Sequence, residues 1–336
     1  MLVAGLLLIG LVADGDGLFE AAGQQLARVA GGSGVLFAGA AILVSGVTAT
    51  LNLDTSVAFL TPVLVHTARN RDRGEPALLY GCLLLSNAGS LLLPGSNLTN
   101  LIVLGHLHLT GGQFATRMWL PWLAAVAVTA GVVGWAERRS LQGPCAEPEE
   151  LRRPVFGVGL VAVLAATVLV ITVRTSALPV FAVGVLAVAT RLAQGRAAVR
   201  QVWSVVGVPV LAGLFGAAVA LGTLGRAWSG PMVLLSHLSA WPTAGFAALV
   251  AVVVNNLPAA SLLAARTPAH AFALLIGLNV GPNLCVTGSL AWLLWLRSAR
   301  DAGARPSLRR ASLLGIVAVP LAMAAALLAL AVTGSA

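Results

Sequence analysis

The sequence predicts an all-α polytopic membrane protein, an inverted repeat with two re-entrant hairpins and two discontinuous transmembrane helices. Three observations support this fold class. Hydrophobic residues make up 58% of the 336 and charged residues only 9%, a composition that soluble domains do not show. Several apolar runs are long enough to cross about 30 Å of hydrocarbon as helices. Polar, Asn-bearing stretches interrupt these runs at corresponding places in two halves of the chain.

The apolar segments divide into two groups around a polar stretch. Residues 138–153, which contain proline and glutamate, are expected to form a cytoplasmic linker between a first transmembrane repeat, 1–137, and a second, 154–336. Residues 18–31 mix charged, amide and apolar side chains and are expected to lie at the interface as an amphipathic connector. The segments fall at about 1–17, 33–68, 77–105, 118–137, 154–173, 178–194, 203–225, 242–267, 270–297 and 311–333.

The net charge of +9 comes from arginines, most of them in short loops between apolar segments. Short basic loops stay on the cytoplasmic side of the cytoplasmic membrane. The charge therefore indicates orientation, and the expected partner is the lipid bilayer and no nucleic acid. The loops expected in the cytoplasm contain Arg69, Arg71, Arg73, Arg138, Arg139, Arg152, Arg153, Arg191, Arg196, Arg200, Arg297, Arg300, Arg305, Arg309 and Arg310.

The sides on which the loops lie determine how each segment crosses the bilayer. Segment 270–297 must run inward to reach the last basic loop, so 242–267 must enter and leave from the outside. We expect it to be a re-entrant hairpin that turns at Asn255-Asn256-Leu257-Pro258. Segment 33–68 is expected to form the matching hairpin, which turns at Asn52–Thr55 and opens to the opposite side. Two hairpins of opposite orientation, each followed by a broken span and a full span, form an inverted repeat.

The first repeat is shorter than the second. Three apolar segments precede the hairpin of the second repeat, whereas only 1–17 precedes that of the first. The difference predicts that about two N-terminal helices are missing, through a late gene start or natural shortening. Mapping of the native N-terminus by mass spectrometry tests this expectation, and a start confirmed at Met1 would exclude it.

The polar interruptions supply candidate ligands for a transported solute. Amide side chains both donate and accept hydrogen bonds, and broken helices are tolerated only where they are buried or line a cavity. A second interpretation is that these side chains only satisfy backbone groups freed by the breaks. No arginine lies near either break in the sequence, which favours a small neutral polar solute or an anion held by helix ends. The candidate substrate-binding residues are Asn52, Thr55, Ser90, Ser96, Asn97, Asn100, Asn255, Asn256, Asn283, Thr287 and Ser289.

Asp54 is the one carboxylate deep within a predicted membrane segment. An ionisable group at this depth is costly and marks a functional site. Its apolar surroundings favour the protonated acid, so Asp54 is the candidate proton-coupling residue and protons are the expected coupling ion. The alternative is that its carboxylate caps the second arm of the hairpin through the backbone amides of Thr55 and Ser56.

Neither a cofactor nor a metal site is expected. The three cysteines, Cys82, Cys145 and Cys285, are too few and too scattered for a disulfide framework or a metal site. An intramembrane enzyme would need a catalytic pair or metal triad at one depth, and Asp54 has no partner carboxylate or histidine within the predicted spans. The sequence therefore predicts a secondary transporter and not an enzyme.

Four stretches resemble the arsenical pump membrane protein family of the ion transporter superfamily. They are Asp54 followed by Thr61-Pro62, Ser90 with Ser96-Asn97-Leu98-Thr99-Asn100, Asn255-Asn256-Leu257-Pro258, and Gly281-Pro282-Asn283-Leu284 with Gly288-Ser289-Leu290-Ala291. The resemblance covers nearly the whole chain and is most specific in the second half. Three positions depart from the family pattern. Leu53 stands where the family has Asn, Asn87 where Asp is frequent, and Asn283 where Lys is common.

The resemblance implies efflux of arsenite or antimonite, driven by protons or assisted by a separate ATPase subunit. It also makes a homodimer a candidate assembly. The three departures leave the substrate and the coupling mechanism open. The alternatives are a carboxylate or inorganic anion permease of the same superfamily, coupled to sodium or protons, and an inactive or regulatory paralogue.

Overall fold

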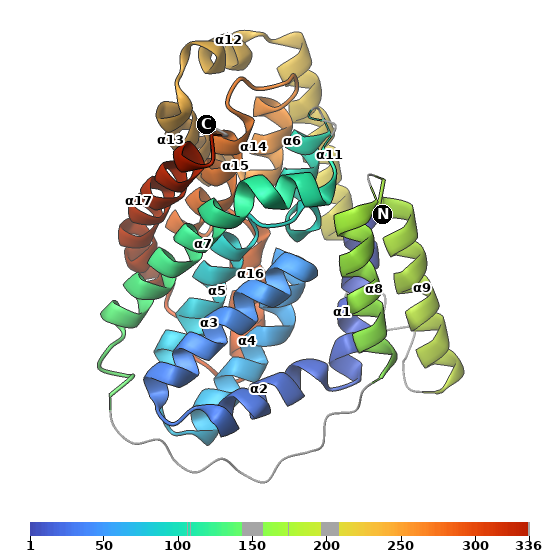
Figure 1. Cartoon of the computed structure of the whole chain (residues 1–336), viewed down its shortest axis with the longest axis vertical. Coiled ribbons are helices and arrows are strands. Elements are labelled where there is room, and N and C mark those ends of the chain that lie inside the picture. Colours follow the sequence, from blue (N-terminus) through green and yellow to red (C-terminus); the bar gives the residue numbers. More distant parts are fainter. Residues whose placement is uncertain (106, 108, 143–156, 174, 196–207, 335–336) are drawn as a thin grey trace.

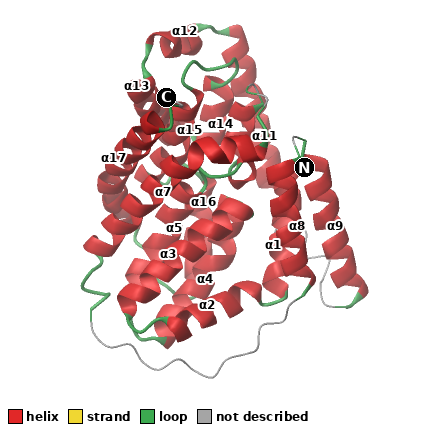
Figure 2. Ribbon diagram, in the orientation of Figure 1, coloured by secondary structure: helices red, strands yellow, loops and turns green. Residues whose placement is uncertain are grey.

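The computed structural model describes the chain except residues 106, 108, 143–156, 174, 196–207 and 335–336. The described residues are helices joined by turns and loops, with no strand among them (Figure 2). This confirms the all-α class. The elements of the N-terminal half are α1 (Leu2–Gly15), α2 (Leu18–Val29), α3 (Ser33–Thr50), α4 (Leu53–Asn70), α5 (Glu75–Gly89), the 3-10 helix η1 (Pro94–Ser96), α6 (Leu98–Leu104) and α7 (Gly111–Ala136).

The C-terminal half shows the same alternation of long and interrupted helices (Figure 1). By length and composition, α3, α7 and α17 could each cross a membrane, and several shorter helices are also apolar. The elements are α8 (Val158–Thr172), α9 (Ala177–Ala193), α11 (Val208–Ala227), α12 (Gly230–His237), α13 (Ala240–Val254), α14 (Asn256–Leu263), α15 (Ala271–Val280), the 3-10 helix η2 (Gly281–Leu284), α16 (Leu290–Asp301) and α17 (Leu308–Val332).

All four predicted interruptions are present. Segment 33–68 divides into α3 and α4 at Asn52, and segment 242–267 divides into α13 and α14 at Asn255. The helix pairs α5–α6 and α15–α16 are each broken by a short 3-10 turn and extended residues. The re-entrant character of the two hairpins stays a prediction.

The packing of the elements also repeats between the halves. Helix α3 packs on α5 as α13 packs on α15, and α4 packs on α16 as α14 packs on α6. The long helices α7 and α17 pack against each other, and each covers the discontinuous helix of its own half. These paired contacts support the inverted repeat, whereas the repeat boundaries 1–137 and 154–336 stay predictions.

Helix α2 runs across the bottom of the molecule as drawn in Figure 1. Its buried residues Phe19, Gly23 and Ala27 recur every fourth position, so they form one face. That face lies on α4, where the Phe19 ring stacks on Phe59 at 5.6 Å between centroids. The arrangement agrees with the amphipathic connector expected for 18–31.

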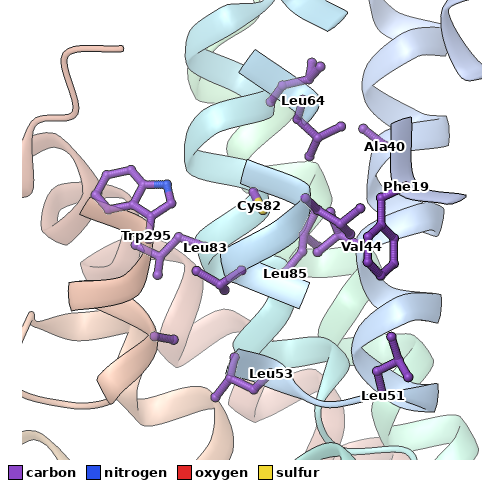
Figure 3. Packing of buried hydrophobic residues seen from close by; sticks show 14 of the residues in the cluster. Phe19, Ala40, Val44, Leu51, Leu53, Leu64, Cys82, Leu83, Leu85 and Trp295 are labelled. Carbon is purple, nitrogen blue, oxygen red and sulfur yellow. The ribbon is translucent and has the colours of Figure 1, made fainter. Parts of the chain in front are cut away.

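Figure 3 shows the apolar core around α4, α5 and α16, in which Leu53, Leu83 and Trp295 lie together. The Trp295 indole donates a hydrogen bond to the carbonyl of Leu79 at 2.9 Å, so its one polar atom is satisfied inside the core. Cys82 lies in the same core and is almost fully buried.

Basic loops from distant parts of the sequence meet at one end of the molecule. Arg69 donates to Glu75 and to the carbonyl of Ala302, both at 2.9 Å, which joins the α4–α5 turn to the loop after α16. Arg310, at the start of α17, pairs with Glu137, at the end of α7, at 2.6 Å. This gathering agrees with one cytoplasmic face. The predicted loop residues Arg152, Arg153, Arg196 and Arg200 lie outside the described residues.

Candidate functional site

The tip between α3 and α4 is organised by Asn52. Its side-chain oxygen accepts a hydrogen bond from the backbone amide of Thr55 at 2.7 Å, which makes Asn52 the N-cap of α4. Its amide nitrogen is buried and has no partner among the described residues, and neither has the Thr55 hydroxyl. Each of the predicted ligands Asn52 and Thr55 therefore takes part in the helix cap. Each also has one buried polar atom, the Asn52 amide nitrogen and the Thr55 hydroxyl, without a partner among the described residues.

Asp54 follows this cap in the first turn of α4 and is half-buried. None of the described residues gives its carboxylate a hydrogen bond or an ion pair. The alternative interpretation of Asp54 as the cap is therefore wrong, because the Thr55 amide donates to the Asn52 side-chain oxygen and the Ser56 amide to the Asn52 carbonyl. Its carboxylate is thus uncommitted, as a proton-coupling residue requires.

The first break, between α5 and α6, is closed by its own polar side chains. The Ser96 hydroxyl donates to the carbonyl of Ser90 at 2.6 Å, and the Asn100 amide donates to the same carbonyl at 2.7 Å. Asn97 caps α6 through the amide of Thr99 at 3.3 Å. All of these side chains are buried. Here the interpretation that the side chains satisfy freed backbone groups accounts for Ser96 and Asn100.

Asn279, which is not among the residues predicted from the sequence, connects this break to the other half of the molecule. It lies on α15 with no exposed surface. Its side-chain oxygen accepts from Ser90 at 2.7 Å and from Asn97 at 2.6 Å. Its amide nitrogen donates to the Asn100 oxygen at 2.9 Å. Three predicted ligands of the first repeat thus bond to one residue of the second.

The second hairpin tip is tied to the second break. Asn255 has a positive φ of 77°, which is unusual for a residue other than glycine. Its amide donates to the carbonyl of Thr287 at 3.2 Å, and the backbone amide of Asn256 donates to the carbonyl of Gly288 at 2.9 Å. The Thr287 hydroxyl donates back to the carbonyl of Val252 at 2.6 Å. Asn255, Asn256 and Thr287 therefore lie together, in a region more exposed than the first break.

Two buried side-chain oxygens of the second break, those of Asn283 and Ser289, have no partner among the described residues. The side-chain oxygen of Asn87 on α5 is also buried without a partner there. The Asn283 amide nitrogen donates to the carbonyl of Leu84 at 2.9 Å, which brings the break against α5. Buried polar groups in native structures are almost always hydrogen-bonded, so a set without partners suggests a ligand.

A cavity of about 660 Å³ lies among α1, α6, α11 and α14. Its walls include Leu98, next to the first break, and Leu257, next to the second hairpin tip. The lining is mainly apolar, and its one cationic side chain is Arg226, which donates to the Thr223 hydroxyl at 3.1 Å. Arg226 is in the last turn of α11 and is distant from both breaks in the sequence. In the folded chain it nevertheless lines this cavity.

The amides and hydroxyls of this region can hold a polar or anionic solute, and the described residues contain no group of three or more metal-binding side chains. Sequence reasoning missed Asn279 because it lies within the apolar run Leu-Leu-Ile-Gly-Leu-Asn-Val. The available signal was its spacing: it precedes Ser289 by the same ten residues that separate Asn87 from Asn97.

Comparison with known proteins identifies the family. A family model described as citrate transporter, CitMHS, matches residues 1–295. Among solved structures, the YdaH transporter of Alcanivorax borkumensis superposes with a TM-score of 0.57 at 16% identity, covering 99% of this chain and 84% of that one. At this identity the likeness shows the fold alone. The superfamily implied by the arsenical pump resemblance is confirmed, and the arsenical specificity stays a prediction. The chain belongs to the citrate transporter family, a membrane transport family of the ion transporter superfamily.

Proposed function

We propose that this protein is a secondary transporter that moves a small carboxylate anion of the citrate class across the cytoplasmic membrane, coupled to protons. The observation that carries the proposal is the meeting of the two interrupted helices. Asn279 of α15 bonds to the first break, and Asn283 of η2 bonds to α5. Interrupted helices that converge from two halves of a membrane protein are typical of a transporter's central site. The family match supports the citrate class.

The chemistry of the region suits a carboxylate. Amide nitrogens and hydroxyls donate hydrogen bonds, and a carboxylate is an acceptor for them. The adjoining cavity has a volume within the range of about 300–1,000 Å³ that is usual for ligand pockets. Arg226 supplies a positive charge to that cavity, which favours the entry of an anion.

Proton coupling is assigned to Asp54. Its carboxylate lies at the tip of α3–α4 without a fixed partner among the described residues, so it can bind and release a proton without breaking a structural bond. A charged Asp54 carboxylate is costly in this apolar setting. Protonation neutralises the carboxylate and removes that cost while the hairpin tip moves. Alternating access then follows from movement of the two hairpin tips relative to the rest of the molecule.

Arsenite or antimonite export is the second candidate. It is favoured by one observation: the side chains left without partners at the breaks are neutral amides and hydroxyls, which suit an uncharged hydroxylated solute. An ATPase subunit and a homodimer belong to this candidate and stay predictions.

Uptake of radiolabelled citrate into proteoliposomes that contain the purified chain tests the proposal. An imposed proton gradient is expected to drive accumulation that an uncoupler abolishes, and unlabelled citrate is expected to compete. The same vesicles are tested with arsenite. Transport of arsenite without transport of citrate would replace the first candidate with the second, and transport of neither by correctly folded protein would exclude both.

A further inference from the structure

The two discontinuous helices share one residue spacing. Asn87 on α5 and Asn279 on α15 each lie two residues before a glycine and ten residues before the N-cap of the next helix. Each donates its amide to the carbonyl four residues earlier, at 3.3 Å for Asn87 and 2.8 Å for Asn279. The two asparagines therefore occupy equivalent positions in the two halves.

The two glycines that follow confirm the equivalence. A β-carbon on Gly89 would lie 3.0 Å from the Cα of Ser45 on α3, and one on Gly281 would lie 2.6 Å from the Cα of Ala248 on α13. Each glycine thus lets its discontinuous helix approach the first arm of the hairpin in its own half. These glycine contacts therefore fix Asn87 and Asn279 at equivalent positions relative to the hairpin of their own half.

The side-chain oxygens of the two asparagines differ in what they bind. The Asn279 oxygen accepts hydrogen bonds from Ser90 and Asn97, and from Thr99 at a longer 3.4 Å. The Asn87 oxygen is equally buried and has no donor among the described residues. The Asn279 oxygen thus receives hydrogen bonds from the other repeat, whereas the Asn87 oxygen receives none from the described residues.

The cap residues explain this difference. At the cap of α6 stands Asn97, whose amide reaches the Asn279 oxygen at 2.6 Å. At the equivalent cap of α16 stands Ser289, a shorter side chain without an amide nitrogen, and its hydroxyl also has no partner among the described residues. Asn283 bonds to Leu84, which lies one turn before Asn87 on the same helix face, and its own oxygen is free as well.

Buried polar atoms without a partner are costly, so the oxygens of Asn283, Ser289 and Asn87, on the second break and on the α5 segment that it contacts, suggest a ligand that completes them. We propose that the two breaks have different tasks. Asn279 is a positioning residue that holds the first break closed from the opposite half, and Asn87 offers its amide oxygen to a hydrogen-bond donor of the transported ligand at the second break. The donor is a hydroxyl or a protonated carboxyl group. The second part rests on the proposed function, because it needs a transported ligand.

Thiol labelling tests the first part without any substrate. Ser96 is fully buried in the first break, and Ser96→Cys is nearly isosteric. The variant is made in a background in which Cys145 and Cys285 are serine, and that background alone reports any reaction of the buried Cys82. With Asn279 intact the new cysteine is expected to be unreactive towards a small methanethiosulfonate. With Asn279→Ala it is expected to react at least about tenfold faster, since about 1.4 kcal/mol of lost closure corresponds to a factor of ten.

Asn87→Ala is the matched control, because it removes the equivalent side chain of the other repeat. The new cysteine is expected to stay unreactive in that variant. If Asn279→Ala does not fold, Asn279→Asp, which keeps the acceptor oxygen, and Ser90→Ala, which removes one donor, take its place. The new cysteine is expected to stay protected in Asn279→Asp and to become partly reactive in Ser90→Ala. Equal reactivity in the Asn279 and Asn87 variants, or protection in every folded variant, would overturn the positioning role.

Transport kinetics test the second part. Asn87→Ala is expected to raise the half-saturating citrate concentration about tenfold, the loss of one good hydrogen bond, with a smaller effect on the maximal rate. Asn87→Asp, which keeps an acceptor, should recover most of the affinity. Asn279→Ala is expected to lower the maximal rate instead. The reverse pattern would contradict the assignment. If citrate is not transported at all, the proposed function fails, while the labelling result still decides the role of Asn279.

Discussion

At the tip of α3–α4, Asn52 has a structural role and Asp54 is the candidate for proton coupling. Asn52 caps the helix, while Asp54 is left without a partner among the described residues. Asn52→Ala is therefore expected to destabilise the protein by about 1 kcal/mol, the usual cost of losing an N-cap. Asp54→Asn should leave stability nearly unchanged. Thermal unfolding of both variants in detergent measures the difference in stability. A larger loss of stability for Asp54→Asn would mean that the Asp54 carboxylate has the structural role.

Residues in polar interruptions could be found from the sequence, and residues in apolar runs could not. The sequence marks Asn97 because it follows Pro94 and Gly95, and Asn255 because it stands beside a second asparagine. Asn279 bonds to more predicted ligands than any of them, yet apolar neighbours on both sides make it resemble an ordinary span residue. Its spacing to Ser289 marks its position in the repeat, but its role follows only from the tertiary contact with the first break. The same holds for Arg226, whose approach to the cavity depends on how α11 packs on α14.

At the scale of elements, a buried ion pair attaches α1 to helices from the second half. Arg191 of α9 contacts Asp16, just after α1, at 2.8 Å, and the backbone amide of Gly159 on α8 donates to the same carboxylate at 2.6 Å. Both charged side chains are less than one tenth exposed, at 7% and 3%. The pair therefore links the start of the chain to α8 and α9 in a setting where an unpaired charge is costly.

Loss of one partner from this ion pair should be severe. Arg191→Met is expected to cost about 3–5 kcal/mol, because it leaves the Asp16 carboxylate buried and uncompensated. The double variant Arg191→Met with Asp16→Asn should recover much of that loss. Unfolding temperatures of the single and double variants measure the coupling. Additive losses would mean that the two side chains do not depend on each other.

The close approach of α13 and α15 gives a second prediction at this scale. Gly281→Ala places a methyl group against the α13 backbone and is expected to destabilise the protein by about 1–3 kcal/mol through overpacking. Gly245 on α13 is the control, because a β-carbon there meets nothing within 4 Å. Gly245→Ala should be neutral or slightly stabilising. Similar unfolding temperatures for the two variants would contradict the tight contact.

At the scale of the whole molecule, the basic loops lie at one end and α12 lies at the other (Figure 1). The positive-inside rule assigns the basic end to the cytoplasm. In a background in which Cys145 and Cys285 are serine, Arg305→Cys should resist a membrane-impermeant maleimide in intact cells and react after lysis. Ser236→Cys on α12 should react in intact cells. The opposite pattern would reverse the orientation.

The order of broken and unbroken segments could be predicted because each break is marked by polar residues, Pro or Gly. The contacts between the halves could not. The pairing of α6 with α14 and of α4 with α16 joins segments more than 150 residues apart, and no local pattern specifies which apolar faces meet. The candidate site was therefore predicted as two separate breaks, and the structure shows how Asn279 and Asn283 join them.

The central claim is that this chain moves a carboxylate anion through a site formed by both breaks and couples that movement to Asp54. The most direct measurement compares citrate accumulation and citrate exchange in proteoliposomes with wild-type protein and with Asp54→Asn. Wild-type protein should accumulate labelled citrate under a proton gradient. The variant should lose accumulation but still exchange labelled for unlabelled citrate, because its binding residues are intact. Gradient-driven accumulation by Asp54→Asn at the wild-type level would contradict the account.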